Sequence, residues 1–160
     1  MSEFKFSQEN EDKFNELLKR YPEKASLSLP SLWMIQYQIG WISPESMVFL
    51  AKRLDTSPID IQSIASFYTM FNLKPIGTYH IQVCKTLSCN LRGSKIITQH
   101  VQNRLGIKVG ETTKDMKFTL SEVECLGSCG TAPMISFNHD YEENLTIEKV
   151  DKLIDEAQNA

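Results

Sequence analysis

The most restrictive feature of this sequence is a change in its hydrophobic periodicity near residues 74–77. Before this point, apolar residues recur at the three- and four-residue spacing of amphipathic helices. After it, stretches of alternating apolar and polar residues, typical of strands, are interspersed with helical patterns. Residues 74–77 themselves include a proline and a glycine, which punctuate regular structure. The sequence therefore predicts an α+β protein with an N-terminal helical region at residues 1–75 and a mixed domain at residues 76–160.

The helical region carries repeated start and stop signals. Residues 43–44 and 57–58 are Ser-Pro pairs, in which the serine suits the N-cap and the proline suits the first helical position. Residues 9–18 and 28–39 have helical patterns as well, and Gly40 supplies a left-handed stop after the second. The apolar stripes of these segments predict the core of a helical bundle.

The second region alternates strands with helices. A strand is predicted over residues 78–84, a helix over residues 91–105, and a second strand over residues 118–124. A hairpin around residues 138–140 and a helix beginning at Thr146 complete the chain. Since a strand–helix–strand connection is almost always right-handed, the first two strands should be parallel neighbours. We therefore expect a four-stranded mixed sheet in a thioredoxin-like arrangement.

The four cysteines form two pairs, each in a loop that leaves a predicted strand. Their spacing is Cys-x4-Cys, then 35 residues, then Cys-x3-Cys. The candidate ligands are Cys84, Cys89, Cys125 and Cys129. A 2Fe–2S cluster needs such a supply, because each tetrahedral iron binds two bridging sulfides and takes two thiolates from the protein. This pattern predicts a small electron carrier with one 2Fe–2S cluster.

Neighbouring residues suit the same site. Gly127 and Gly130 bracket the second pair and should allow tight turns with backbone N–H groups close to sulfur. Asn90 is expected to cap the helix after Cys89, so that its N-terminal amides face the cluster. Nearby cations could offset further negative charge; they are Lys85, Arg92 and Lys95.

Other chemistries of four cysteines are weaker alternatives. Structural zinc sites also accept four thiolates but favour two-residue gaps, so a zinc-bound scaffold or interaction module remains open. A dithiol–disulfide enzyme usually has Cys-x-x-Cys, which is absent. A plant-type ferredoxin requires a third cysteine where Arg92 stands. A last alternative is that all four cysteines are buried structural residues. Their pairing at two strand ends argues against it, because structural cysteines would not need this arrangement.

Composition narrows the function further. The net charge is -3 with acids and bases mixed, which argues against nucleic-acid binding. The longest apolar stretch, residues 47–51, is far shorter than the ~20 residues of a membrane helix. The acidic first dozen residues resemble neither a signal nor a transit peptide, so we expect a reducing compartment. No Gly-x-Gly-x-x-Gly or phosphate loop is present, and therefore no dinucleotide or flavin site is expected.

The chain resembles the thioredoxin-like ferredoxin subunit, the small E-type subunit, of respiratory NADH–quinone oxidoreductase. The resemblance runs from about residue 21 to residue 155. Its motifs are Ile-Ala-Ser-Phe-Tyr-Thr-Met-Phe at residues 64–71, Val83-Cys84 with Cys89, Glu-Cys-Leu-Gly-Ser-Cys at residues 124–129, and Ala132-Pro133. It implies that Cys84 and Cys89 hold one iron of the cluster, and that Cys125 and Cys129 hold the other.

The resemblance also implies the setting in which the chain works. It would be a subunit of a translocating NADH:quinone oxidoreductase, cytoplasmic and peripheral to the inner membrane within the soluble arm. Its partner would be the larger flavoprotein subunit that binds NADH and FMN, with residues 1–75 as a docking region. The isolated chain should then carry electrons without oxidising NADH. Equivalent subunits of NAD-linked hydrogenases and formate dehydrogenases are the alternative.

Overall fold

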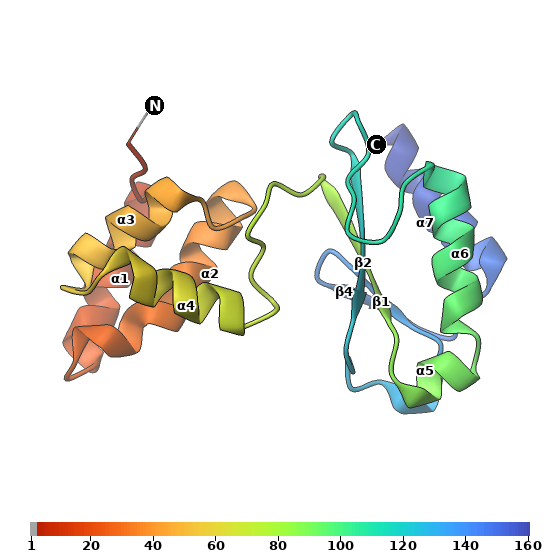
Figure 1. The fold of residues 1–160 in the computed structure, drawn as a ribbon, viewed down its shortest axis with the longest axis horizontal. Coiled ribbons are helices and arrows are strands. Elements are labelled where there is room, and N and C mark those ends of the chain that lie inside the picture. The colour runs from red at the N-terminus through yellow and green to blue at the C-terminus, as the bar shows by residue number, and fades with distance from the viewer. Residues whose placement is uncertain (1–2) are drawn as a thin grey trace. The chain divides into compact units, whose positions relative to one another are not determined.

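The computed structural model describes residues 3–160 and divides the chain into two compact units (Figure 1). Unit 1 extends to Pro75 and unit 2 begins at Ile76, at the change in periodicity. Within the described residues, none of the helices has both the length and the apolarity needed to cross a bilayer.

The regular secondary structure in the described part of unit 1 is all helical. Its elements are α1 (Gln8–Arg20), the 3-10 helix η1 (Lys24–Leu27), α2 (Ser28–Ile39), α3 (Pro44–Arg53) and α4 (Pro58–Phe67). The Ser43 and Ser57 side chains accept hydrogen bonds from the backbone N–H groups of Ser46 and Asp60, as expected of N-caps. Asp60 completes a capping box at the start of α4. The helical prediction for this region is confirmed.

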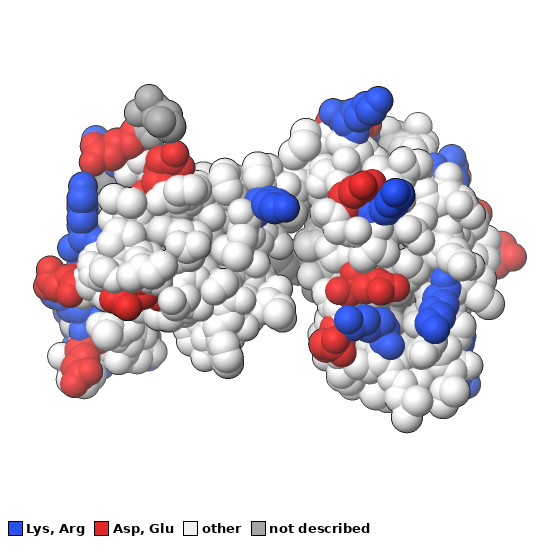
Figure 2. Space-filling model, in the orientation of Figure 1, with Lys and Arg blue, Asp and Glu red and all other residues white. Residues whose placement is uncertain are grey.

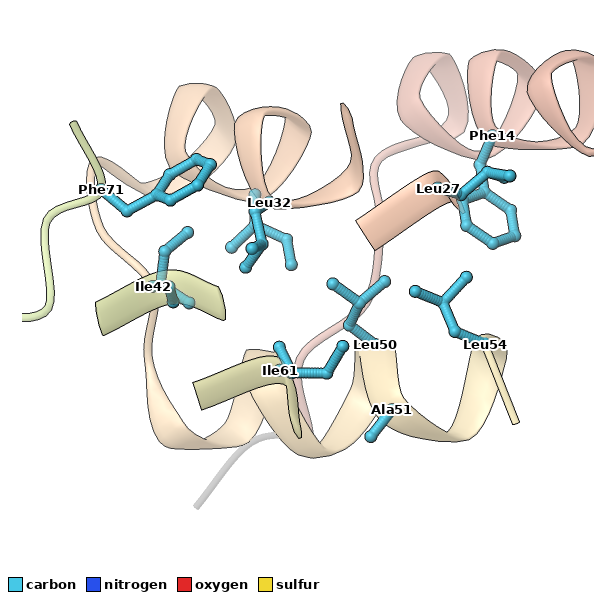
Figure 3. Close-up of a cluster of buried hydrophobic side chains, with 11 residues drawn as sticks. Phe14, Leu27, Leu32, Ile42, Leu50, Ala51, Leu54, Ile61 and Phe71 are labelled. Carbon is cyan, nitrogen blue, oxygen red and sulfur yellow. The ribbon is translucent and has the colours of Figure 1, made fainter. Parts of the chain in front are cut away.

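One hydrophobic core holds these helices together. Figure 3 shows side chains from all four α-helices and η1 pointing into it. The fully buried residues include Phe14, Leu27, Leu32, Ile35, Ile42, Leu50 and Ile61. Because each helix contributes only one stripe to this core, no helix could bury its apolar residues alone.

Unit 2 contains a four-stranded sheet in the order β2-β1-β3-β4. Its elements are β1 (Tyr79–Cys84), α5 (Leu87–Leu91), α6 (Ser94–Leu105), β2 (Phe118–Val123), the 3-10 helix η2 (Cys129–Thr131), β3 (Ile135–Phe137), β4 (Asp140–Glu142) and α7 (Ile147–Asn159). Strands β1 and β2 are parallel, whereas β3 is antiparallel to both β1 and β4. The mixed sheet and the α+β class are as predicted.

The α-helices α5, α6 and α7 of unit 2 lie on one side of its sheet (Figure 1). The core on that side combines sheet residues such as Ile81 and Leu120 with Val101 of α6 and Ile154 of α7. The opposite face of β1 is also largely buried, unlike the half-buried strand that alternation predicted. On that face, burial lowers the pKa of His80 to about 4.

The helix predicted over residues 91–105 is wrong at its beginning. Cys89 and Asn90 lie inside the short helix α5, and the chain changes direction at Gly93, whose φ of 97° is left-handed. Helix α6 then starts at Ser94 without a side-chain cap. Asn90 is therefore not an N-cap.

The capping box of α4 yields a stability prediction. Replacing Ser57 by Ala removes an acceptor for the Asp60 N–H and should destabilise unit 1 by about 1 kcal/mol. Both tryptophans, Trp33 and Trp41, belong to unit 1, so their fluorescence during urea unfolding reports on this unit. Ser63→Ala, an exposed change within the same helix, is the matched control and should be neutral or slightly stabilising. Equal unfolding midpoints for Ser57→Ala and the wild type would contradict the prediction.

Candidate metal centre

The topology of the sheet brings the two cysteine pairs to the same edge. Cys84 is the last residue of β1 and lies opposite Val123, the last residue of β2, so that Cys125 follows two residues later. Strand β3 pairs with the other side of β1. The loop from β2 to β3 must therefore pass across the end of β1. The Cys84 N–H donates to the Met134 carbonyl at 3.3 Å as this loop enters β3.

The first pair is buried. Cys84 and Cys89 are each 2% exposed and pack with Ala132 and Met134 of the crossing loop. Helix α5 turns Cys89 inward and leaves Leu91 on its solvent side. Each of the two thiols affects the pKa of the other.

Hydrogen bonds to sulfur distinguish the two buried thiols. Burial raises the pKa of Cys84, but the Thr86 hydroxyl, 3.3 Å from Sγ, and the N–H groups of Leu126 and Thr86 outweigh it, so the pKa is lowered overall. Burial raises the pKa of Cys89 to about 11, together with the interaction with Cys84. Cys84 is therefore the thiol of this pair whose anion the protein stabilises.

The second pair is exposed and its thiols lie side by side. Cys125 Sγ and Cys129 Sγ are 3.9 Å apart, and the Gly127 N–H donates to Cys125 Sγ at 3.3 Å. Two sulfurs bound at ~2.3 Å to one tetrahedral metal are separated by about 3.8 Å. This pair therefore has the spacing of two thiolates on one tetrahedral ion. Within residues 3–160, no three His, Cys, Asp or Glu side chains converge on a single point.

The two glycines beside the second pair differ. Gly127 has a φ of 85°, a left-handed conformation that strains any residue with a Cβ. Gly130 has no such φ, and a Cβ built on it would meet no atom within 4 Å. The backbone at residue 127 therefore requires glycine, whereas the φ of Gly130 is compatible with other residues.

Two of the three charged neighbours, Lys85 and Arg92, are engaged in contacts of their own. Lys85 Nζ lies 3.1 Å from Glu124 Oε1, and this carboxylate offsets its charge. Arg92 Nε donates to the Ala132 carbonyl at 3.0 Å and so ties the end of α5 to the crossing loop. The sequence suggested that these cations offset the charge of the cluster. In the structure, Arg92 instead helps to position the crossing loop.

Several polar residues around the cysteines were missed by the sequence analysis. Thr86 could have been noticed, because it follows Cys84 by two residues. Glu143 accepts hydrogen bonds from the Ser128 and Thr131 hydroxyls of the second loop, and these two hydroxyls lower its pKa. No local signal links Glu143 to a loop twelve or more residues away.

Comparison with known proteins establishes the family. The family model for thioredoxin-like 2Fe-2S ferredoxins matches residues 14–158. The chain belongs to the thioredoxin-like 2Fe-2S ferredoxin family. The E-type subunit of NADH-quinone oxidoreductase from Rickettsia conorii is 46% identical over 162 residues, covering 99% of this chain and 97% of that protein. The mitochondrial NADH dehydrogenase (ubiquinone) flavoprotein 2 of Dictyostelium discoideum is 45% identical over 98% of this chain and 64% of its own length.

A solved structure supports the fold of this family member. The crystal structure of an NAD+-reducing NiFe-hydrogenase in the air-oxidised state matches 83% of this chain and 23% of the hydrogenase chain, with a TM-score of 0.76. The sequence identity is 22%, so the likeness concerns the fold. The chain thus shares its architecture with part of a much longer redox protein.

The contrast between the two glycines can be tested by metal loading. Gly127→Ala forces a Cβ into a left-handed position and should lower the iron and sulfide content after anaerobic reconstitution. Its penalty of roughly 1–2 kcal/mol should reduce loading without unfolding unit 2. Gly130→Ala is the matched control and should load like the wild type, because the φ of Gly130 is not left-handed. Equal loading of both variants would show that the turn tolerates a side chain.

Proposed function

We propose that this chain is the electron-transfer subunit of an NADH-quinone oxidoreductase and holds one 2Fe–2S cluster. The observation that carries the proposal is the placement of two thiol pairs at one edge of the sheet, with the second pair already 3.9 Å apart. Cys84 and Cys89 would hold one iron, and Cys125 and Cys129 the other. The names of the curated relatives support the assignment to this complex.

The residues around the cysteines suit a redox role. A bound 2Fe–2S cluster supplies one-electron chemistry and carries negative charge. The Thr86 hydroxyl and the Gly127 N–H lie within hydrogen-bonding reach of cysteine sulfurs and would stabilise that charge. The first cysteine pair is buried and would shield one side of the cluster from water. The second pair is exposed and would leave the other side of the cluster accessible for electron exchange.

A partner must supply the step that connects NADH to the cluster. NADH gives up two electrons as a hydride, whereas one such cluster normally transfers one electron at a time. FMN and the NADH site are therefore proposed to lie on the larger flavoprotein subunit. The NAD+-reducing hydrogenase is a protein of related fold that also acts on this nucleotide. An equivalent subunit of an NAD-linked hydrogenase or formate dehydrogenase is the alternative role.

Unit 1 offers a surface suited to docking this partner. Residues 61–73 contain no Lys, Arg, Asp or Glu, and the face of unit 1 over α4 is largely uncharged (Figure 2). Phe67 is 77% exposed there and Met70 is 40% exposed. Aromatic and methionine side chains are enriched and charges are depleted in the centres of protein interfaces. We propose that residues 1–75 dock the chain to the soluble arm of the complex, peripheral to the membrane on its cytoplasmic side.

The cofactor assignment predicts a defined composition. The purified chain should contain about two iron ions and two acid-labile sulfides, because four thiolates complete the coordination of two tetrahedral irons. Metal analysis and sulfide determination on the same anaerobic sample provide the measurement. Zinc with no sulfide would support the scaffold alternative, and four irons per chain would rule out a single 2Fe–2S cluster.

The division of labour between subunits predicts how the chain responds to reductants. The isolated, flavin-free chain should be reduced by dithionite and should stay oxidised with NADH, as followed by bleaching of its visible absorption. Addition of the FMN-containing flavoprotein subunit should produce a stable complex and allow NADH to reduce the cluster where its potential permits. Rapid reduction of the isolated chain by NADH would contradict the proposed need for a partner.

A further inference from the structure

The loop with the second cysteine pair is held by few bonds of its own. Between Cys125 and Thr131 it forms no strand, and both cysteines are exposed. Its internal contacts include the Gly127 N–H bond to Cys125 Sγ at 3.3 Å and the Thr131 N–H bond to the Ser128 carbonyl at 3.3 Å. A loop of this kind needs external contacts to keep two thiols at a fixed separation.

Glu143 supplies such a contact from the segment after β4. Its Oε1 accepts a hydrogen bond from Thr131 Oγ1 at 2.7 Å and another from Ser128 Oγ. The two hydroxyl oxygens lie 2.8 Å apart, so one carboxylate oxygen closes a compact polar triangle. An ionised carboxylate only accepts hydrogen bonds, so both hydroxyls can donate to it, and such charge-assisted bonds are stronger than neutral ones.

The segment that carries Glu143 is itself fixed to the core of unit 2. The Asn144 N–H donates to the Thr131 carbonyl at 2.7 Å, and the Leu145 N–H donates to the Pro133 carbonyl at 3.0 Å. Leu145 is 6% exposed and belongs to the core beneath α6 and α7. The carboxylate therefore extends from a rigid support rather than from a free loop.

The contacted hydroxyls occupy sensitive places in the cysteine loop. Ser128 directly precedes Cys129, and Thr131 ends the 3-10 turn that begins at Cys129. Restraining both residues restrains the backbone that carries the Cys129 thiol. Arg92 also donates to the Ala132 carbonyl at 3.0 Å, so a second side chain from outside the loop fastens it.

We propose that Glu143 is a positioning residue for the cluster. Through Ser128 and Thr131 it holds the Cys125–Cys129 loop in the conformation that presents two thiols to one iron. This inference rests on the proposed function, because it concerns the second half of the proposed cluster site. It adds a residue outside the cysteine motifs that determines how firmly the cluster is held.

The experiment compares loss of the cluster to a chelator in wild-type and variant full-length chains. Glu143→Ala should lose its visible absorption to excess EDTA about tenfold faster or more, because two bonds to a charged acceptor are removed. Glu143→Gln keeps a side-chain oxygen that can accept and should lie close to the wild type. Glu142→Ala removes the same charge one residue earlier and should behave as the wild type.

Two further readouts separate positioning from general destabilisation. The electron paramagnetic resonance spectrum of the dithionite-reduced cluster should change in Glu143→Ala and stay the same in Glu142→Ala. In the Ser128→Ala background, Glu143→Ala should have a smaller effect than in the wild type, because one of its two partners is already absent.

Failure of the Glu143 proposal can be distinguished from failure of the proposed cluster function. Equal chelation rates and unchanged spectra for Glu143→Ala, with a loaded wild type, would overturn this inference alone. Should Glu143→Ala fail to fold or load, Ser128→Ala decides: faster chelation than the wild type supports the proposal, and an equal rate overturns it. A wild-type chain without iron and sulfide would contradict the proposed function and this inference with it.

Discussion

The parallel pairing of β1 and β2 is the constraint on which the rest of unit 2 depends. A right-handed crossover through α5 and α6 places both carboxyl ends at the same edge. Because β3 then pairs on the far side of β1, the chain leaving β2 has to cross the end of β1 before it can re-enter the sheet. That end is Cys84. The connection thus carries Cys125 and Cys129 over the first pair through topology, before any metal is considered.

This arrangement makes the two halves of the site unequal. Cys84 and Cys89 come from a strand end and a short helix and are covered by Met134 of the crossing loop. Cys125 and Cys129 lie on the crossing loop itself, outside the core. In the proposed cluster, the buried half would be set by the packing of unit 2. The exposed half depends on local restraints, namely the left-handed turn at Gly127 and the hydroxyl contacts of Glu143. Burial and hydrogen bonds to sulfur are among the factors that set the potential of such clusters.

Sequence reasoning succeeded where one local rule determines the structure. The N-caps Ser43 and Ser57, the strand ending at Cys84 and the parallel pairing of β1 with β2 follow from capping, spacing and the crossover connection. It failed where the structure depends on contacts distant in the sequence. The role of Glu143 requires knowing that the segment after β4 returns beside the cysteine loop. Gly127 and Gly130 also look alike beside the cysteines in the sequence, yet only Gly127 has a left-handed φ, and no local pattern reveals this difference.

Helix α6 begins at Ser94 rather than at the predicted residue 91, and the reason is geometric. Ile97 and Val101 direct α6 toward the sheet. At about 100° per residue, an unbroken helix would rotate Cys89 by roughly 80° from Ile97 and roughly 120° from Val101, away from the face that packs on the sheet. The left-handed residue Gly93 interrupts the helix between them. Helix α5 can then turn Cys89 toward Cys84 while α6 buries its own stripe, and Arg92 at the junction reaches the crossing loop. The apolar spacing of residues 97–105 predicts a helix there, but it does not show at which residue that helix begins. The requirement that one helical segment face the cysteines and the next face the sheet is what makes the interruption necessary.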